Sequence, residues 1–208
     1  MSQNRNRVYV TQGAFMSSVV SMFLSKGYTI VDRLENADIL CLTGGADIDP
    51  MLYGEKALPG TWFNESRDKI EIEAFNKAVE RGLMIFGICR GGQLANCLNG
   101  GKLWQHIEGH GSRHPITDLK TGRVVTSSSI HHQMFRPAPD AEIVATCNEA
   151  YLKVAEHEIW EAKNGTPNDD VEVCWYAKSR SLCIQGHPEV GPDSFTDYCF
   201  ELLERYAS

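Results

Sequence analysis

Cys89 occupies a glycine-flanked corner in the segment GICRGG at residues 87–92. An apolar run at residues 83–86 predicts a buried strand before it, and residues 93–98 predict a helix after it. A sharp turn from strand to helix pushes the cysteine sulfur out over the sheet edge, and the N–H groups of the first helical turn favour its thiolate. This pattern is typical of a nucleophile elbow and predicts attack on an electrophilic carbon.

A cysteine nucleophile needs a base, and the base needs a group that orients it. His187 and Glu189 flank a proline, which favours an extended segment on which both side chains point the same way. We therefore predict that His187 contacts Cys89 and that Glu189 holds the second ring nitrogen of His187. Backbone N–H groups at residues 44–45 and at Arg90 are the candidates for binding the oxygen of a tetrahedral intermediate.

The elements that must position these residues alternate between strand and helix in the first half of the chain. Strands are predicted at residues 7–11, 28–32 and 39–43, and helices at residues 14–25 and 65–81. This alternation predicts an α/β fold with a mainly parallel central sheet flanked by helices on both faces. Functional residues of such sheets lie outside the carboxyl ends of the strands. Residues 44–45, Cys89 and His187 each follow a predicted strand and are expected to meet there.

The second half of the chain is richer in strands. They are predicted at residues 123–127, 142–146, 171–177 and 182–185, before a closing helix at residues 194–205. Residues 111–122 and 163–170 are expected to be exposed turns, and residues 151–160 to form a packed helix or loop face. Because the 208 residues contain no repeat or low-complexity linker, we expect one domain over residues 1–208.

The composition excludes several classes of function. A net charge of −7 gives no electrostatic footprint for nucleic acid, and no apolar run or signal peptide indicates a membrane partner. Seven cysteines, an odd number without framework spacing, favour free thiols in a reducing cytoplasm. Six of them lie in apolar or amphipathic segments and are expected to be buried structural residues. These are Cys41, Cys97, Cys147, Cys174, Cys183 and Cys199.

Five segments together resemble the class I glutamine amidotransferase-like proteins, and within them the γ-glutamyl hydrolase branch that includes γ-glutamyl-γ-aminobutyrate hydrolases. They are GICRGGQ at residues 87–93 with Asn96 and glycines 100–101, LTGGADIDP at 42–50 with YGE at 53–55, ESRD at 65–68 with Glu71, SIHHQ at 129–133, and QGHPE at 185–189. The segments occur in the order typical of the family and span most of the chain.

The resemblance implies a flavodoxin-like three-layer sandwich, a small-molecule γ-glutamyl substrate and no cofactor. The site residues that it implies are the triad Cys89, His187 and Glu189, the oxyanion-hole amides of Gly45 and Arg90, and the glutamyl-binding residues Gln93, Ser129, Ile130 and His131. The chain departs from the family at Gly186, where a bulky aromatic residue is usual. We expect this glycine to open space beside the base, on the leaving-group side of the pocket.

A metal site is suggested by His106, His110 and His114, which are spaced by four residues. Glycines at 109 and 111 disfavour a continuous helix, and the sequence pattern offers no cysteine or carboxylate pair to complete a tetrahedral set. No metal is therefore expected. Adjacent His131 and His132 point to opposite faces if the segment is extended, so only one is expected to reach the pocket.

The function predicted from these residues is a cysteine-dependent amidohydrolase that cleaves a γ-glutamyl amide bond through a glutamyl thioester. The same chemistry would serve a glutaminase subunit that supplies ammonia to a separate synthetase, which would then be its partner. A non-catalytic binding module that keeps the fold is the third possibility. The segment DIDP at residues 47–50 favours the hydrolase branch. Neither the amine half of the substrate nor the oligomeric state follows from the sequence.

Overall fold

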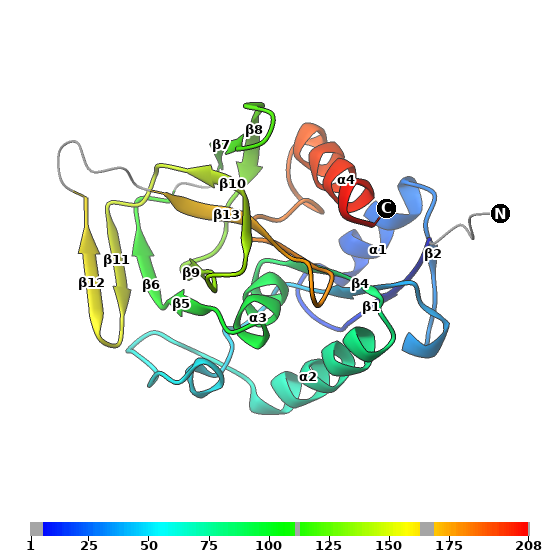
Figure 1. Ribbon diagram of the computed structural model, residues 1–208, viewed down its shortest axis with the longest axis horizontal. Helices are drawn as coiled ribbons and strands as arrows, with labels where there is room; N and C mark the ends of the chain where they lie inside the picture. The colour runs from blue at the N-terminus through cyan, green and yellow to red at the C-terminus, as the bar shows by residue number, and fades with distance from the viewer. Residues whose placement is uncertain (1–5, 111–112, 163–168, 208) are drawn as a thin grey trace.

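A nine-stranded mixed sheet runs through the molecule in the order β2-β1-β3-β4-β14-β13-β10-β7-β8 (Figure 1). The computed structural model describes residues 6–110, 113–162 and 169–207. The first five strands of that order are parallel: β2 (Thr29–Ile30), β1 (Arg7–Val10), β3 (Ile39–Leu42), β4 (Met84–Ile88) and β14 (Ser181–Ile184). The other four pair antiparallel: β13 (Asp170–Tyr176), β10 (Glu142–Cys147), β7 (Arg113–Asp118) and β8 (Val124–Ser128). The expected α/β sheet is confirmed, although only its first half is parallel.

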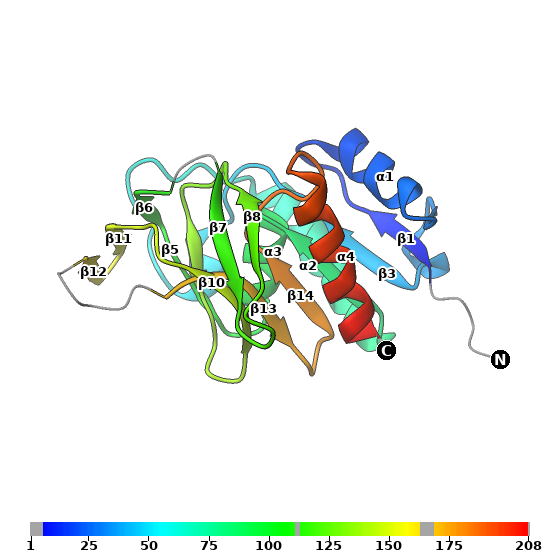
Figure 2. The same ribbon diagram turned by 90° about the horizontal axis from the view of Figure 1, so that it is seen from above.

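Helices cover both faces of the sheet, as the alternating pattern predicts. Figure 2 shows α1 (Met16–Ser25) and α4 (Asp193–Ala207) on one face, with α2 (Glu65–Glu80) and α3 (Arg90–Leu98) on the other. The apolar residues of α4 repeat at helical spacing and are buried: Phe195, Tyr198, Cys199 and Leu202. All four residues of β3 are buried because both faces of this central strand are covered. One apolar core therefore lies on each side of the sheet.

Short elements were harder to predict than the central ones. A three-stranded sheet joins β12 (Glu158–Glu161), β11 (Leu152–Ala155) and β6 (His106–Glu108), and β5 (Lys102–Trp104) pairs with β9 (Met134–Arg136). Two short 3₁₀ turns, η1 (Leu34–Asn36) and η2 (Pro50–Tyr53), lie between the longer elements. The expectation of a helix or loop face at residues 151–160 is wrong, because this segment is the β11–β12 hairpin. Residues 113–118 form β7 rather than an exposed turn, while residues 111–112 and 163–168 lie outside the described ranges.

All seven cysteines are buried free thiols, as expected for the six structural ones. Within the described ranges, no helix has the length and apolar character needed to cross a membrane.

Candidate active site

Three parallel strands end beside one cavity of 270 Å³. Gly45 follows β3, Cys89 follows β4 and His187 follows β14, and all three line this cavity. Because β3, β4 and β14 are parallel neighbours, their carboxyl ends meet at the same sheet edge. The predicted convergence of these segments is therefore correct.

Cys89 has a strained backbone at the corner between β4 and α3. Its φ of 49° and ψ of −114° lie in a region that non-glycine residues rarely adopt, and its N–H donates to the Ile184 carbonyl at 2.7 Å. A Cβ on Gly91 would lie 2.2 Å from the Leu42 carbonyl oxygen, so only glycine lets the helix begin this close to the sheet. The corner therefore places the Cys89 sulfur at the start of α3, where the N–H groups of the first turn have no partner within the helix.

His187 is a buried imidazole held on two sides. Its Nδ1 lies 2.7 Å from Glu189 Oε1, and Cys89 lines the same cavity wall beside it. Burial alone would lower the pKa of His187, but the contacts and charges of Cys89 and Glu189 raise it to about 10. An imidazolium is thus favoured at neutral pH, which places a positive charge beside Cys89.

The turn that carries His187 is fixed by β8. The His187 N–H donates to Ser128 Oγ at 2.9 Å, and Ser128 Oγ in turn donates to the His187 carbonyl at 2.7 Å. The Phe15 ring meets the His187 ring edge-on, with centroids 5.6 Å apart. These contacts leave the imidazole little freedom to leave the cavity wall.

A half-buried arginine, Arg67, holds the loop that carries Gly45. Arg67 Nη2 donates to the carbonyls of Thr43 and Gly44 at 3.0 Å, and Arg67 is paired with Glu71 at 3.1 Å. Gly45 has a φ of 146°, and a Cβ there would lie 2.1 Å from Arg67 Nη1. The positive φ of Gly45 therefore favours glycine at this position, and a larger residue would also have to displace the Arg67 guanidinium.

The Arg90 side chain is fully buried and does not line the cavity. It forms ion pairs with Asp68 and Glu71 of α2. Because this buried guanidinium is paired with two carboxylates, it anchors the first turn of α3 to α2. The Arg90 backbone N–H belongs to the first helical residue and has no partner within the helix.

Gln93, Ile130 and His131 line the cavity, whereas Ser129 does not, although it is buried next to them in sequence. Gln93 Nε2 donates to the Gln133 carbonyl at 3.1 Å, and His131 Nδ1 lies 2.9 Å from the same oxygen. A carbonyl only accepts, so the His131 proton is on Nδ1 and its Nε2 is an acceptor.

The cavity is also lined by residues that are not predicted from the sequence to belong to it. These are Ala14, Phe15, Ala46, Asp47, Trp62, His132 and Gln133. His132 Nε2 and the Trp62 N–H both bond to Asp47, at 3.0 and 2.9 Å. The expectation that only one of the adjacent histidines reaches the pocket is wrong, because residues 130–133 do not form a strand. The position of Asp47 two residues after Gly45 indicates that it lies near the site, whereas no sequence feature around Trp62 does so.

Gly186 does not open the leaving-group side of the pocket, so that expectation is wrong. A Cβ at this position would lie 2.4 Å from Ser127 Oγ and 2.8 Å from both Phe195 Cζ and the Ser128 carbonyl. Gly186 is also not part of the cavity lining. Phe195 of α4 and strand β8 already occupy the space that a larger side chain would need.

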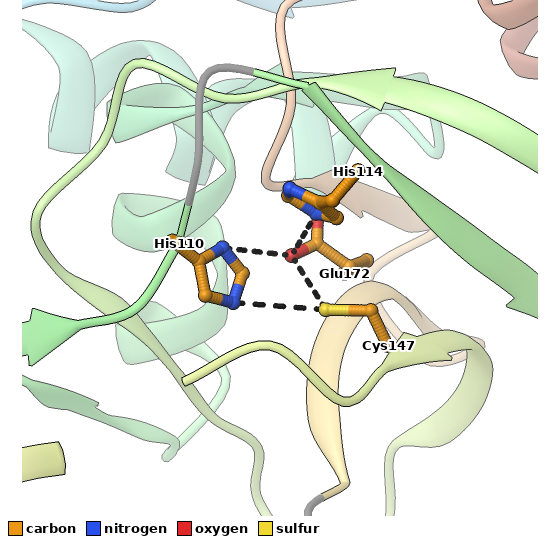
Figure 3. Close-up of side chains that lie close together, drawn as sticks. All are labelled: His110, His114, Cys147 and Glu172. Carbon is orange, nitrogen blue, oxygen red and sulfur yellow. Dashed lines mark hydrogen bonds and ion pairs between the residues drawn. The ribbon is translucent and has the colours of Figure 1, made fainter. Parts of the chain in front are cut away.

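A second cluster lies behind this cavity. His110 and His114 meet Cys147 and Glu172, and the donor atoms of the four residues lie within 4.8 Å of one another (Figure 3). A cysteine and a carboxylate therefore do join two of these histidines, and the expectation that none would is wrong. The partners come from β10 and β13, far away in sequence. His106 lies elsewhere, 3.3 Å from Glu108.

Comparison with known proteins agrees with this geometry. The sequence matches the peptidase C26 family over residues 3–189. It is 36% identical over 201 residues to the glutamine amidotransferase-like protein YvdE of Lactococcus lactis, with 88% of this chain and 82% of that protein aligned. It is also 30% identical to the carbamoyl phosphate synthase small chain of Neisseria gonorrhoeae over 85% of this chain, which spans only 41% of that protein.

Solved structures share the fold at low identity. PurLQS from Thermotoga maritima superposes with a TM-score of 0.66 and 17% identity, over 98% of this chain and 100% of that one. A glutamine amidotransferase from the same organism gives a TM-score of 0.63 at 15% identity, over 98% of this chain and 86% of that one. The match to the family model, the sequence relatives and the fold all agree. The chain belongs to the peptidase C26 family of class I glutamine amidotransferase-like proteins.

Proposed function

We propose that the protein is a cysteine-dependent amidohydrolase that cleaves a γ-glutamyl amide bond through a glutamyl-thioester intermediate. The observation that carries this proposal is the strained Cys89 at the start of α3, beside a His187 ring that Glu189 holds at 2.7 Å. Cys89 is the nucleophile, His187 the acid and base, and Glu189 the group that orients His187.

The reaction proceeds in two halves. The Cys89 thiolate attacks the γ-carbonyl carbon, and the oxyanion that forms accepts hydrogen bonds from the N–H groups of Gly45 and Arg90. Each donor of this kind contributes about 10²- to 10³-fold in rate. The His187 imidazolium protonates the departing nitrogen as the C–N bond breaks. Water, deprotonated by His187, then attacks the thioester and releases glutamate, and Cys89 is regenerated.

The cavity wall favours a glutamyl head group. It contains the polar side chains of Gln93, His131 and Gln133 together with the Asp47 carboxylate. Carboxylate and amide oxygens accept hydrogen bonds, which suits a donor-rich group such as an α-ammonium. Gln93 and Ile130 complete this part of the wall. A cavity of 270 Å³ is small for a ligand site and suits an amino-acid-sized acyl group.

A second cysteine, Cys147, also lies near a histidine and a glutamate, but its surroundings disfavour nucleophilic attack. Burial and the nearby carboxylates of Glu172 and Asp170 raise the pKa of the Cys147 thiol far above its usual range. It ends strand β10 rather than beginning a helix, so no helix N-terminus favours its thiolate. We therefore assign the nucleophile to Cys89.

One alternative function shares this chemistry. The aligned relative named carbamoyl phosphate synthase small chain covers 85% of this chain at 30% identity. The protein would then be a glutaminase subunit that passes ammonia to a separate synthetase. Cys89, His187 and Glu189 would keep the same roles, and only the fate of the amine would differ.

A substrate panel tests these proposals. The purified protein is incubated with glutamine, γ-glutamyl-γ-aminobutyrate and a γ-glutamyl anilide, and the acyl-enzyme is detected by intact mass spectrometry. We expect one added glutamyl group on Cys89. Cys89→Ala should abolish it, whereas Cys97→Ala, which changes a buried cysteine of the same helix, should retain it.

The possible outcomes separate the candidates. Turnover of several γ-glutamyl amides without a partner supports the hydrolase. Turnover of glutamine alone, rising sharply when a synthetase is added, supports the glutaminase subunit. If the folded wild-type protein forms no acyl-enzyme with any substrate, the catalytic proposal is wrong and a binding module remains.

A further inference from the structure

The cluster behind the cavity draws its members from four places in the fold. His110 follows β6, His114 lies in β7, Cys147 ends β10 and Glu172 lies in β13 (Figure 3). The side chains of His110 and His114 are 2% exposed and that of Glu172 is 1% exposed. Two imidazoles, a thiol and a carboxylate thus meet in the interior, at a point where separate strands come together.

The spacing of the donor atoms fits a tetrahedral metal ion. Glu172 Oε1 lies 3.2 Å from His114 Nε2, 3.7 Å from His110 Nδ1 and 3.6 Å from Cys147 Sγ. Zinc bonds of about 2.0–2.3 Å at tetrahedral angles hold their ligand atoms roughly 3.3–3.7 Å apart. The remaining donor pairs lie within 4.8 Å of one another, so the four donors could bind one ion once the cluster contracts around it.

The hydrogen bonds around His110 direct one lone pair into the cluster. His110 Nε2 lies 3.3 Å from Asp170 Oδ2 and 3.6 Å from Cys147 Sγ, and Nδ1 has no hydrogen-bond partner among the described residues. Asp170 Oδ2 also accepts the Ala150 N–H at 2.8 Å, and Asp170 Oδ1 is paired with Lys153 at 2.8 Å. A carboxylate behind a histidine in this way is the usual support of a metal ligand, because it keeps the proton on the outer nitrogen.

Charge and burial also favour a cation here. Glu172 Oε2 is buried without a hydrogen-bond partner in the described part of the chain. A divalent ion bound to two neutral imidazoles, one thiolate and one carboxylate makes a neutral unit, which removes the cost of an unpaired charge in the interior. Mixed nitrogen and sulfur donors select zinc over magnesium or calcium.

We propose that His110, His114, Cys147 and Glu172 form a closed structural zinc site, separate from the Cys89 cavity. Four protein donors leave no open position, so the ion ties strands together rather than activating water. The site also touches the cavity wall, since the His131 ring meets the His110 ring with centroids 5.1 Å apart. Zinc would therefore hold the loop that carries His131 in place.

Metal analysis of the full chain tests the proposal. The protein is purified without a histidine tag under reducing conditions, stripped with a strong chelator, reloaded with zinc and dialysed. We expect about one tightly held zinc ion per chain in both the wild type and Cys89→Ala. The Cys89→Ala background excludes zinc held by the Cys89–His187 pair. Cobalt loading should give a thiolate-to-cobalt charge-transfer band and the strong visible bands of tetrahedral cobalt.

Variants assign the ion to the cluster. Cys147→Ser should lose the charge-transfer band and at least most of the zinc, whereas Cys199→Ser, a change at another buried cysteine, should keep both. Asp170→Asn, which weakens the support of His110, should lower zinc affinity by about 10- to 100-fold. Zinc should raise the Tm of the wild type and not that of Cys147→Ser.

Three results would overturn the proposal. One is a folded wild-type chain, checked by circular dichroism, that holds less than about a tenth of an equivalent of zinc after loading. Another is cobalt binding without a thiolate band, which is measured on the wild type and so does not depend on the folding of a variant. The third is a zinc content that Cys147→Ser and Asp170→Asn leave unchanged.

Discussion

Replacing Glu189 by glutamine removes one negative charge beside His187 and keeps the side chain nearly the same size. In the native protein Glu189 Oε1 lies 2.7 Å from His187 Nδ1, and the Glu189 side chain is fully buried. A carboxylate only accepts, so it holds the proton on Nδ1 and stabilises the imidazolium. A glutamine amide can instead donate to Nδ1 and hold the opposite tautomer.

The size of the effect follows from the pKa of His187. Its rise from 6.5 to about 10 corresponds to about 5 kcal/mol at 1.36 kcal/mol per pKa unit. Cys89 and Glu189 together produce this rise against burial, so the loss of Glu189 removes a part of this stabilisation. A part of about 2 kcal/mol corresponds to roughly 30-fold in rate. The wrong tautomer of the His187 ring lowers the rate further, since the matching change in serine hydrolase triads lowers kcat by about 10⁴-fold.

The assay is single-turnover acylation by a γ-glutamyl anilide, with kcat/KM measured in parallel. We expect Glu189→Gln to lower both by between about 30- and 10⁴-fold while circular dichroism stays native. Glu73→Gln, a change of the same type at an exposed position of α2, should match the wild type. If Glu189→Gln acylates within about threefold of the wild type, Glu189 does not orient the base and the reasoning fails.

Three further predictions follow from the same contacts. The pKa of His187 is raised in the folded state, so the stability that Glu189 adds through it is full below about pH 6.5 and is lost as pH rises toward about 10. The free energies of unfolding of wild type and Glu189→Gln, measured in urea, should therefore converge over that range, and a constant difference would contradict this. Gly45→Ala should lower kcat by about 10²-fold or more with a smaller change in KM, because its Cβ would meet Arg67 and displace an oxyanion donor. Steady-state kinetics measures this effect, and an unchanged kcat would show that the Gly45 N–H is not such a donor. Gly186→Ala should lower the free energy of unfolding by about 1–3 kcal/mol, because the new Cβ would meet the Ser128 backbone carbonyl, which cannot move aside as a side chain can. An unchanged midpoint of urea unfolding would show that the space is open.

The sequence indicated the centre of the fold better than its edge. Strands β3 and β4 are buried on both faces and therefore appear as unbroken apolar runs, and the elbow between β4 and α3 has its own glycine pattern. Strands β5, β6 and β9 are three residues long and show no measurable periodicity. Their pairing partners, and not their own side chains, determine that they are strands.

The site shows the same division between local and distant causes. Cys89, His187 and Gly45 were predictable because each follows a strand of the parallel half, and parallel strands end at one edge. The filled space at Gly186 is not predictable from neighbouring residues, because Phe195 comes from α4. The His110 cluster is not predictable from spacing, because Cys147 belongs to a strand far away in sequence.

The β13–β14 hairpin has a mechanical consequence that neither site reveals alone. Glu172 lies in β13, its carbonyl accepts the Gln185 N–H at 2.8 Å, and His187 follows two residues later. This hydrogen-bonded pair of strands therefore connects the buried His110 cluster to the base beside Cys89. A substitution that shifts Glu172 is expected to shift His187 as well. The two positions are therefore expected to evolve as a pair, and redesign of either should allow for movement of the other.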